Sequence, residues 1–252
     1  MRIAVAGGTG TVGRHIVAAA RHRGHDVVVL SRASGVDVNT GVGLMEALNG
    51  VDAVVDATNT TTLFARTARR FFESATRNLL EAERINGVGH HVVPSVVGID
   101  AIDASYYAGK LAQERAVAAG PIPYTIARAG QFHEYVAQLV VGMKGPIVVL
   151  PKTLSRPVAA REVGAHLVTV TEAGPTGRAT DLVGPRDERL AELARRMLAY
   201  DRVTGRRVLE LRLPGSFGRG LASGALRGNA PRLEADMTFD SWLESDDHRR
   251  PL

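Results

Sequence analysis

Short apolar runs alternate with longer amphipathic stretches along the first half of this chain. The runs are four or five residues long and rich in valine, isoleucine and alanine, which predicts buried strands. The predicted strands cover residues 2–6, 26–30, 53–56, 91–94 and 124–128. Helices are predicted between them over 11–23, 43–49, 62–85 and 103–119. This alternation is typical of a parallel sheet with helices on both faces.

Glycine and proline interrupt this pattern after about residue 130. They stand at Gly142, Gly145, Pro146, Pro151 and Pro157. The later part still predicts helices over 158–171, 188–200 and 239–243, and strands over 179–183 and 208–213. The charged segment 245–252 is expected to be frayed. We expect a core over residues 1–150 and a smaller lobe over 151–252, packed together as one compact unit.

Composition narrows the classes of function. With 252 residues and 45% hydrophobic content, the chain can bury a large α/β core. It lacks cysteine, which excludes disulfides, thiolate nucleophiles and cysteine-based metal sites. Its 31 basic and 26 acidic residues leave a net charge of +5 without a basic run, so no nucleic-acid partner is expected. No apolar run reaches the ~20 residues of a spanning helix, so we expect a cytoplasmic protein without a membrane partner. A monomer and a homodimer are both compatible with the sequence.

A glycine-rich loop directly follows the first predicted strand. Gly8, Gly10 and Gly13 satisfy the pattern G-x-G-x-x-G and open the first predicted helix. Such glycines permit a tight turn, close approach of a pyrophosphate and close helix–strand packing, while the helix N-terminus attracts the anion. A glycine turn without a ligand is the alternative. The residues expected to contact the dinucleotide are Gly7, Gly8, Thr9, Gly10, Thr11, Val12 and Gly13.

The end of the second predicted strand indicates which dinucleotide is preferred. NAD sites usually carry an acid there for the ribose hydroxyls, whereas this chain has Ser31 and Arg32. An arginine with a neighbouring hydroxyl suits a 2′-phosphate, so we expect NADP(H) in preference to NAD(H). Arg32 as a solvated surface residue is the alternative, and Asp37 could still reach the adenine or ribose. Thr58 and Asn59 follow another strand and would either line the same crevice or cap the next helix.

A tyrosine and a lysine stand four residues apart on the helix predicted over 103–119. Tyr106 and Lys110 therefore project from one face. A tyrosine has a reference pKa of ~10, and a nearby ammonium lowers this pKa while it can also hold a ribose hydroxyl. Ser95, at the end of an upstream strand, could hydrogen-bond a substrate carbonyl. Tyr107 is the alternative phenol, and either ring could simply cover the helix–sheet junction.

Histidines and their neighbours supply the remaining candidates. Gln131, Phe132 and His133 follow the strand over 124–128 and are expected to line a substrate pocket. His90 and His91 are adjacent in a strand and therefore point to opposite faces, so they do not suggest a metal site. No metal is expected.

Several of these segments resemble the atypical short-chain dehydrogenase/reductases, specifically the NmrA-like NAD(P)-binding group. The segments are 7–13, 94–100, 106–110 and 126–133, with looser similarity at 156–158 and 182–185. The resemblance implies a Rossmann-type α/β fold, a doubly wound parallel sheet with a small C-terminal substrate lobe. It also implies nicotinamide-dependent reduction with Ser95, Tyr106 and Lys110 in the catalytic positions.

Two functions follow as hypotheses. The first is an NADP(H)-dependent oxidoreductase that reduces a small-molecule carbonyl, enone or quinone, with Tyr106 as proton donor. The second is a protein that binds NADP(H) without chemistry, as a sensor or scaffold. The sequence does not name the substrate, because shape decides specificity in the loosely patterned second half.

Overall fold

The computed structural model describes residues 1–249, which form two compact units. Unit 1 comprises Met1–Ser95, Asp103–Arg128 and Val163–Thr180, and unit 2 comprises Val96–Ile102, Ala129–Glu162 and the chain from Asp181 onward. The units are interleaved along the sequence, so a single boundary at residue 150 does not separate them. Residue 150 instead lies inside a strand of unit 2.

Unit 1 is built on a parallel sheet. Its strands are β1 (Arg2–Ala6), β2 (Asp26–Leu30), β3 (Ala53–Asp56), β4 (His90–Val96), β5 (Tyr124–Ala129) and β8 (Gly177–Arg178). They follow the order β5-β4-β3-β1-β2, with β8 beside β5, and β1 pairs in parallel with both β2 and β3. The last residues of β4 and β5 belong to unit 2.

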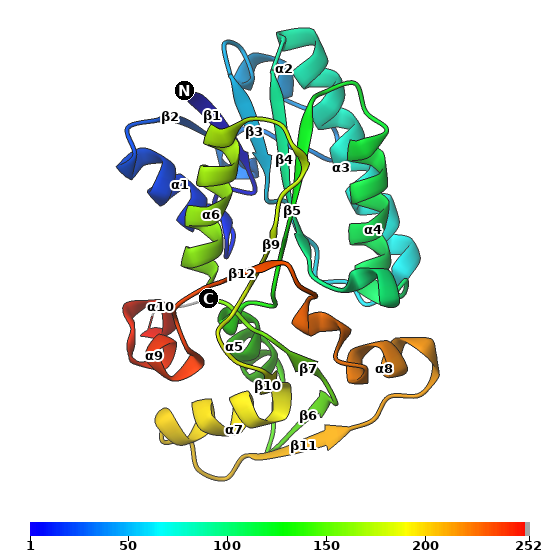
Figure 1. Cartoon of the computed structure of the whole chain (residues 1–252), viewed down its shortest axis with the longest axis vertical. Helices are drawn as coiled ribbons and strands as arrows, with labels where there is room; N and C mark the ends of the chain where they lie inside the picture. The colour runs from blue at the N-terminus through cyan, green and yellow to red at the C-terminus, as the bar shows by residue number, and fades with distance from the viewer. Residues whose placement is uncertain (250–252) are drawn as a thin grey trace. The chain divides into compact units, whose positions relative to one another are not determined.

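Helices cover both faces of this sheet. They are α1 (Gly13–His22), α2 (Leu44–Ala47), α3 (Ala65–Asn86), α4 (Ser105–Ala118) and α6 (Ala160–Ala173), of which α6 joins unit 1 from Val163 onward. Figure 1 shows α1 and α6 on one face and α3 and α4 on the other. The predicted doubly wound Rossmann-type sheet is therefore confirmed.

The chain reverses its direction of winding at β1. It first forms β2 on one side of β1 and then returns to form β3 on the other. Such a switch point opens a crevice at the carboxyl ends of the two strands, where ligands bind in open α/β sheets. The loops after β1 and β3 are thus the walls of the expected site.

Helix α4 is closely packed against α3. A Cβ atom on Gly109 would lie 2.7 Å from both Ala68 Cβ and Phe72 Cδ2, so only glycine allows this approach. Every residue from Tyr107 to Glu114 is buried, including three that are charged or carry an amide. Polar groups on this helix therefore need partners inside the protein.

Unit 2 consists of shorter elements. Its strands are β6 (Ile147–Pro151), β7 (Leu154–Ser155), β9 (Asp181–Val183), β10 (Glu188–Arg189), β11 (Arg207–Leu211) and β12 (Arg232–Glu234). Its helices are α5 (His133–Gly142), α7 (Leu190–Tyr200), α8 (Gly215–Ala222), α9 (Phe239–Glu244) and α10 (Asp246–Arg249), with 3-10 turns at Ile99–Ala101 and Ala225–Arg227. Strands β6 and β11 pair in parallel, and their inward side chains pack with Phe239 and Trp242 in one core.

One prediction about the second half is wrong, because Asp246–Arg249 forms a short helix where fraying was expected; residues 250–252 lie outside the described residues. Helix α5 had not been predicted. Within the part of the chain that the structure describes, no helix combines the length and apolar character needed to cross a bilayer.

Candidate dinucleotide and catalytic site

The glycine loop between β1 and α1 has the geometry of a backbone cradle. Gly7 adopts a φ of +70°, and its carbonyl accepts a hydrogen bond from the Gly10 amide at 2.9 Å. A Cβ atom on Gly13 would lie 2.1 Å from the Gly7 oxygen, which no real side chain tolerates. The loop is therefore held in this turn by glycines at 7 and 13.

The tip of this loop is exposed at the start of helix α1. Thr9 and Gly10 are exposed, Thr11 is half-buried, and the Val12 side chain points into the core, so Val12 offers a ligand only its backbone. Helix α1 has neither a side-chain cap nor an acidic residue in its first turn. Its first amides and its dipole thus favour a negatively charged group.

The loop after β3 forms the facing wall. A Cβ atom on Gly7 would lie 2.7 Å from the carbonyl oxygen of Ala57, so the two loops touch through their backbones. Asp56 Oδ1 accepts hydrogen bonds from the Thr58 amide at 3.1 Å and the Thr58 hydroxyl at 2.6 Å. Thr58 is buried and its hydroxyl is already used, whereas Asn59 is exposed. Neither residue caps the next helix, because α3 begins only at Ala65.

The residues expected to choose the cofactor lie after β2. Ser31 caps the 3-10 turn Arg32–Ser34, where it forms a reciprocal pair with Ser34. Arg32 is exposed. Asp37 forms a hydrogen bond within its own loop, because its Oδ1 accepts from the Asn39 amide at 2.9 Å. Arg32 therefore remains the candidate for a 2′-phosphate, while Asp37 stabilises its own turn.

Tyr106 and Tyr107 occupy different environments at the start of α4. The Tyr106 ring is half-buried and packs edge-on against Phe72 of α3, with centroids 5.9 Å apart. Tyr107 is buried, and its ring meets that of Tyr106 edge-on at 5.7 Å. Tyr106 therefore meets the same Phe72 ring as the Lys110 ammonium, and the choice between the two phenols stays open.

Lys110 is almost completely buried, with 4% of its surface exposed. Its ammonium donates to Gln113 Oε1 and lies 4.9 Å from the centre of the Phe72 ring. Burial lowers the pKa of Lys110 to about 8, although the negative charges of Asp56 and Glu114 raise it. The protonation state of Lys110 therefore depends on the charged groups buried near it.

Ser95 lies near the end of β4 with its hydroxyl unused. It is buried, and its Oγ has no hydrogen-bond partner among the described residues. Strand alternation puts Ser95 on the same face as Val93, which packs with Val117 of α4. An unsatisfied buried hydroxyl on this face fits a donor that waits for a ligand.

The proposed substrate residues belong to unit 2. Gln131 and Phe132 are half-buried, and Phe132 forms a bridge with Val158. His133 is only 1% exposed, and its ring packs against Phe239 and Trp242. Burial lowers the pKa of His133 to about 4. This side chain is therefore enclosed in the core of unit 2, and its assignment to a substrate pocket stays a prediction.

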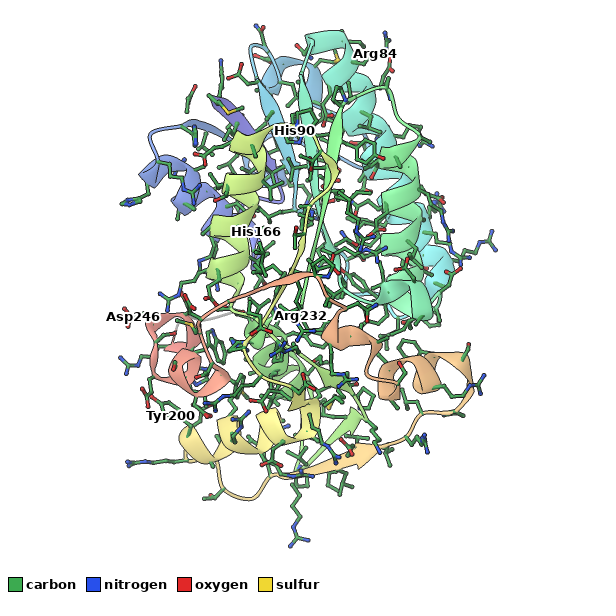
Figure 2. All side chains as sticks on the ribbon, viewed as in Figure 1. Arg84, His90, His166, Tyr200, Arg232 and Asp246 are labelled. Atoms are coloured by element: carbon green, nitrogen blue, oxygen red, sulfur yellow. The ribbon has the colours of Figure 1, made fainter. Side chains whose placement is uncertain are left out.

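The adjacent histidines point to opposite faces of β4, as strand geometry predicted. His90 (Figure 2) lies 2.9 Å from the Thr125 hydroxyl, whereas His91 contacts Glu83 at 2.8 Å. Burial disfavours a charged His91, but Glu83 outweighs it and the pKa of His91 is raised. Both histidines are buried and form contacts inside the protein.

The sequence reasoning missed a set of buried polar residues around α4. Gln113 joins Lys110 to Asp56, and Glu114 forms a two-pronged ion pair with Arg128 at 2.6 and 2.8 Å. A usable signal was present, since Gln113 and Glu114 follow Lys110 by three and four residues on one helix.

Comparison with known proteins agrees with this geometry. The family model described as NAD(P)H-binding matches residues 7–152. The NADPH-dependent quinone oxidoreductase QOR2 of Escherichia coli has a similar fold, with a TM-score of 0.72 and 18% identity over 96% of this chain and 98% of that one; it has also been solved with NADPH. MoeE5, solved with UDP-glucuronic acid and NAD, has a TM-score of 0.73 and 17% identity over the whole of both chains.

One curated relative is similar over a shorter stretch. The photosystem II assembly factor Ycf39 of Synechocystis sp. (strain ATCC 27184 / PCC 6803 / Kazusa) is 32% identical over an alignment of 111 residues that covers 38% of this chain. The chain spans about a third of that relative's length, since the match covers 34% of it.

Proposed function

Because this chain belongs to the NAD(P)H-binding family, as an atypical short-chain dehydrogenase/reductase of the NmrA-like group, we propose that it is an NADP(H)-dependent oxidoreductase. Its substrate class is a small carbonyl compound, enone or quinone. The observation that carries this proposal is the open glycine cradle at the switch point of the sheet, with Lys110 linked by hydrogen bonds to the end of β3. The enzyme would act as a monomer or homodimer on a small molecule.

The residues present fit the dinucleotide. The exposed Gly10 leaves room for a pyrophosphate at the uncapped start of α1, and Arg32 offers a guanidinium to a 2′-phosphate. When bound, the reduced nicotinamide supplies a hydride. Tyr106 would then donate the proton to the acceptor, and Lys110 would lower the pKa of that phenol and hold the ribose. The unsatisfied hydroxyl of Ser95 would orient the acceptor oxygen.

A second function has its own support. Lys110 is 4% exposed with its ammonium on Gln113, and the Tyr106 ring rests on Phe72, an arrangement that also suits a purely structural role. The relative named as an assembly factor points the same way. Under this alternative the chain binds NADP(H) and acts as a sensor or scaffold without turnover.

The test is NADPH oxidation with a panel of quinones, enones and ketones. Tyr106→Phe is expected to lower turnover by about 100-fold or more, the usual contribution of general acid catalysis, with cofactor affinity nearly unchanged. Tyr107→Phe tests the alternative phenol, and Tyr200→Phe is the matched control, because Tyr200 lies 43% exposed on α7 (Figure 2). If only Tyr107→Phe is impaired, that phenol is the donor. If no acceptor accelerates oxidation by the wild type, the sensor function stands instead.

A further inference from the structure

A buried carboxylate joins the wall of the dinucleotide crevice to the lysine on α4. Asp56 is completely buried at the end of β3. Its Oδ1 accepts from the amide and hydroxyl of Thr58, and its Oδ2 accepts from Gln113 Nε2 at 2.8 Å. Three donors therefore satisfy this buried carboxylate within the protein.

Gln113 can stand in only one orientation between its neighbours. The Lys110 ammonium has only donors and the Asp56 carboxylate only acceptors, so the amide must turn its oxygen to the lysine and its nitrogen to the aspartate. Each hydrogen bond polarises the next in such a chain. The amide thereby transmits the negative charge of Asp56 toward the ammonium.

Other groups around Lys110 do not replace this contact. Glu114, on the same helix, is committed to Arg128 of β5 through two hydrogen bonds. Glu83 of α3 is committed to His91 of β4. From α3 the lysine meets only the uncharged ring of Phe72 among the described contacts of its ammonium.

We propose that Gln113 and Asp56 are positioning residues that hold the Lys110 ammonium charged and in place, and that Asp56 ties this lysine to the loop facing the glycine cradle. The catalytic role of Lys110 in this proposal rests on the proposed function. The link between Lys110, Gln113 and Asp56 is independent of that function, because its hydrogen bonds form without a ligand. Binding of the dinucleotide against the loop after β3 would thus be felt at the lysine through Asp56.

Lysine side-chain NMR tests the link directly. The chain contains only Lys110, Lys144 and Lys152, so selective lysine labelling yields three signals that single Lys→Arg variants assign. In the wild type, burial lowers the pKa of Lys110 to about 8, while Lys144 is exposed and serves as an internal control. The measurement needs neither substrate nor turnover.

Three variants carry the test. Gln113→Leu removes both hydrogen bonds and is expected to lower the pKa of Lys110 by roughly one unit, while Gln113→Glu adds a charge and is expected to raise it. Asp56→Asn removes the charge at the far end and is expected to lower it, even if Gln113→Leu fails to fold. Gln138→Leu, on the exposed face of α5, is the matched control and leaves the lysine unchanged.

Activity supplies the second readout. The alkaline limb of the pH profile of kcat is expected to move in the same direction and by the same amount as the measured pKa, which a loss of stability alone would not produce. An unchanged Lys110 titration in all three variants overturns the proposal, even if turnover is intact. If the Lys110 titration shifts in these variants but none of the tested acceptors accelerates NADPH oxidation by the wild type, the link stands and the proposed function is refuted.

Discussion

Replacing Gly13 by alanine tests whether the glycine loop is the cofactor cradle. The new Cβ atom would lie 2.1 Å from the Gly7 carbonyl oxygen and 2.8 Å from Gly8 Cα, and both obstacles are backbone. Real Cβ contacts stay beyond 3.0 Å, so the loop must move by 3.0 − 2.1 = 0.9 Å, about one ångström. Overpacking of this kind typically costs about 1–3 kcal/mol, and rigid backbone favours the upper end.

The expected results are a lower melting temperature and weaker cofactor binding. For a chain of this size, about 3 kcal/mol corresponds to a fall in Tm of roughly 6–12 °C. A displacement of about 1 Å in a site that holds its ligand by backbone amides is expected to weaken the binding of NADPH by at least about tenfold. Differential scanning fluorimetry and calorimetric titration measure the two effects.

Two further glycine variants serve as controls. Gly142→Ala adds a Cβ atom that meets nothing within 4 Å at the end of α5, so it should lower neither quantity. Gly10→Ala meets the Gly7 oxygen at 3.2 Å in an exposed position, so it should cost little stability but block close approach of the pyrophosphate. If Gly13→Ala melts and binds NADPH like the wild type, the assignment of the loop as the cradle is refuted.

Two other predictions concern cofactor choice and acid stability. Arg32→Ala should weaken the binding of NADPH by about tenfold or more, with little effect on the binding of NADH, as measured by titration. The control is Arg84→Ala, which removes an exposed arginine paired with Glu81 (Figure 2). Equal losses of affinity for both cofactors would contradict the 2′-phosphate contact. Burial lowers the pKa of His133 from 6.5 to about 4, so the unfolded chain takes up this proton first as the pH falls. The fold should lose up to about 3 kcal/mol from this residue between pH 6.5 and 4, and His133→Leu should flatten that loss in urea titrations; an equally steep loss in the variant would show that His133 does not cause it.

Much of unit 1 was readable from the sequence because its signals are local. The bounds of β1, β2 and β3 agree with the predicted strands, since buried parallel strands leave continuous apolar runs between glycines and charged residues. The glycine loop was equally plain. Gly13 is required by contacts within the loop, and Gly7 by contact with the adjacent loop.

Unit 2 was harder because its signals are weaker. Helix α5 begins directly at His133 after an extended Phe132, and its sequence is apolar on most sides, so periodicity did not reveal it. Strand β6 lies between Gly145 and Pro151, which interrupt the pattern. In contrast, Asp246–Arg249 carried a usable helix signal, with acids in its first turn and basic residues in its last.

The buried side of the site depends on long-range packing. Gln113 and Asp56 are 57 residues apart, and nothing local to either indicates that they meet. The burial of His133 likewise depends on the fold, since its place after a strand does not indicate that its ring packs inside a core. Sequence patterns pointed to Lys110 as a candidate, but only the fold shows that Gln113 links its ammonium to Asp56.

The central claim is most directly tested by mixing NADPH-loaded protein with a quinone and following the loss of the reduced nicotinamide absorbance in a single turnover. The proposed oxidoreductase function predicts oxidation faster than in buffer, slowed by about 100-fold in Tyr106→Phe. Gly13→Ala should lower the fraction of protein loaded with NADPH, and with it the amount oxidised. If the wild type binds NADPH tightly and its oxidation is no faster than in buffer with every quinone, enone and ketone, the chain is not the oxidoreductase proposed.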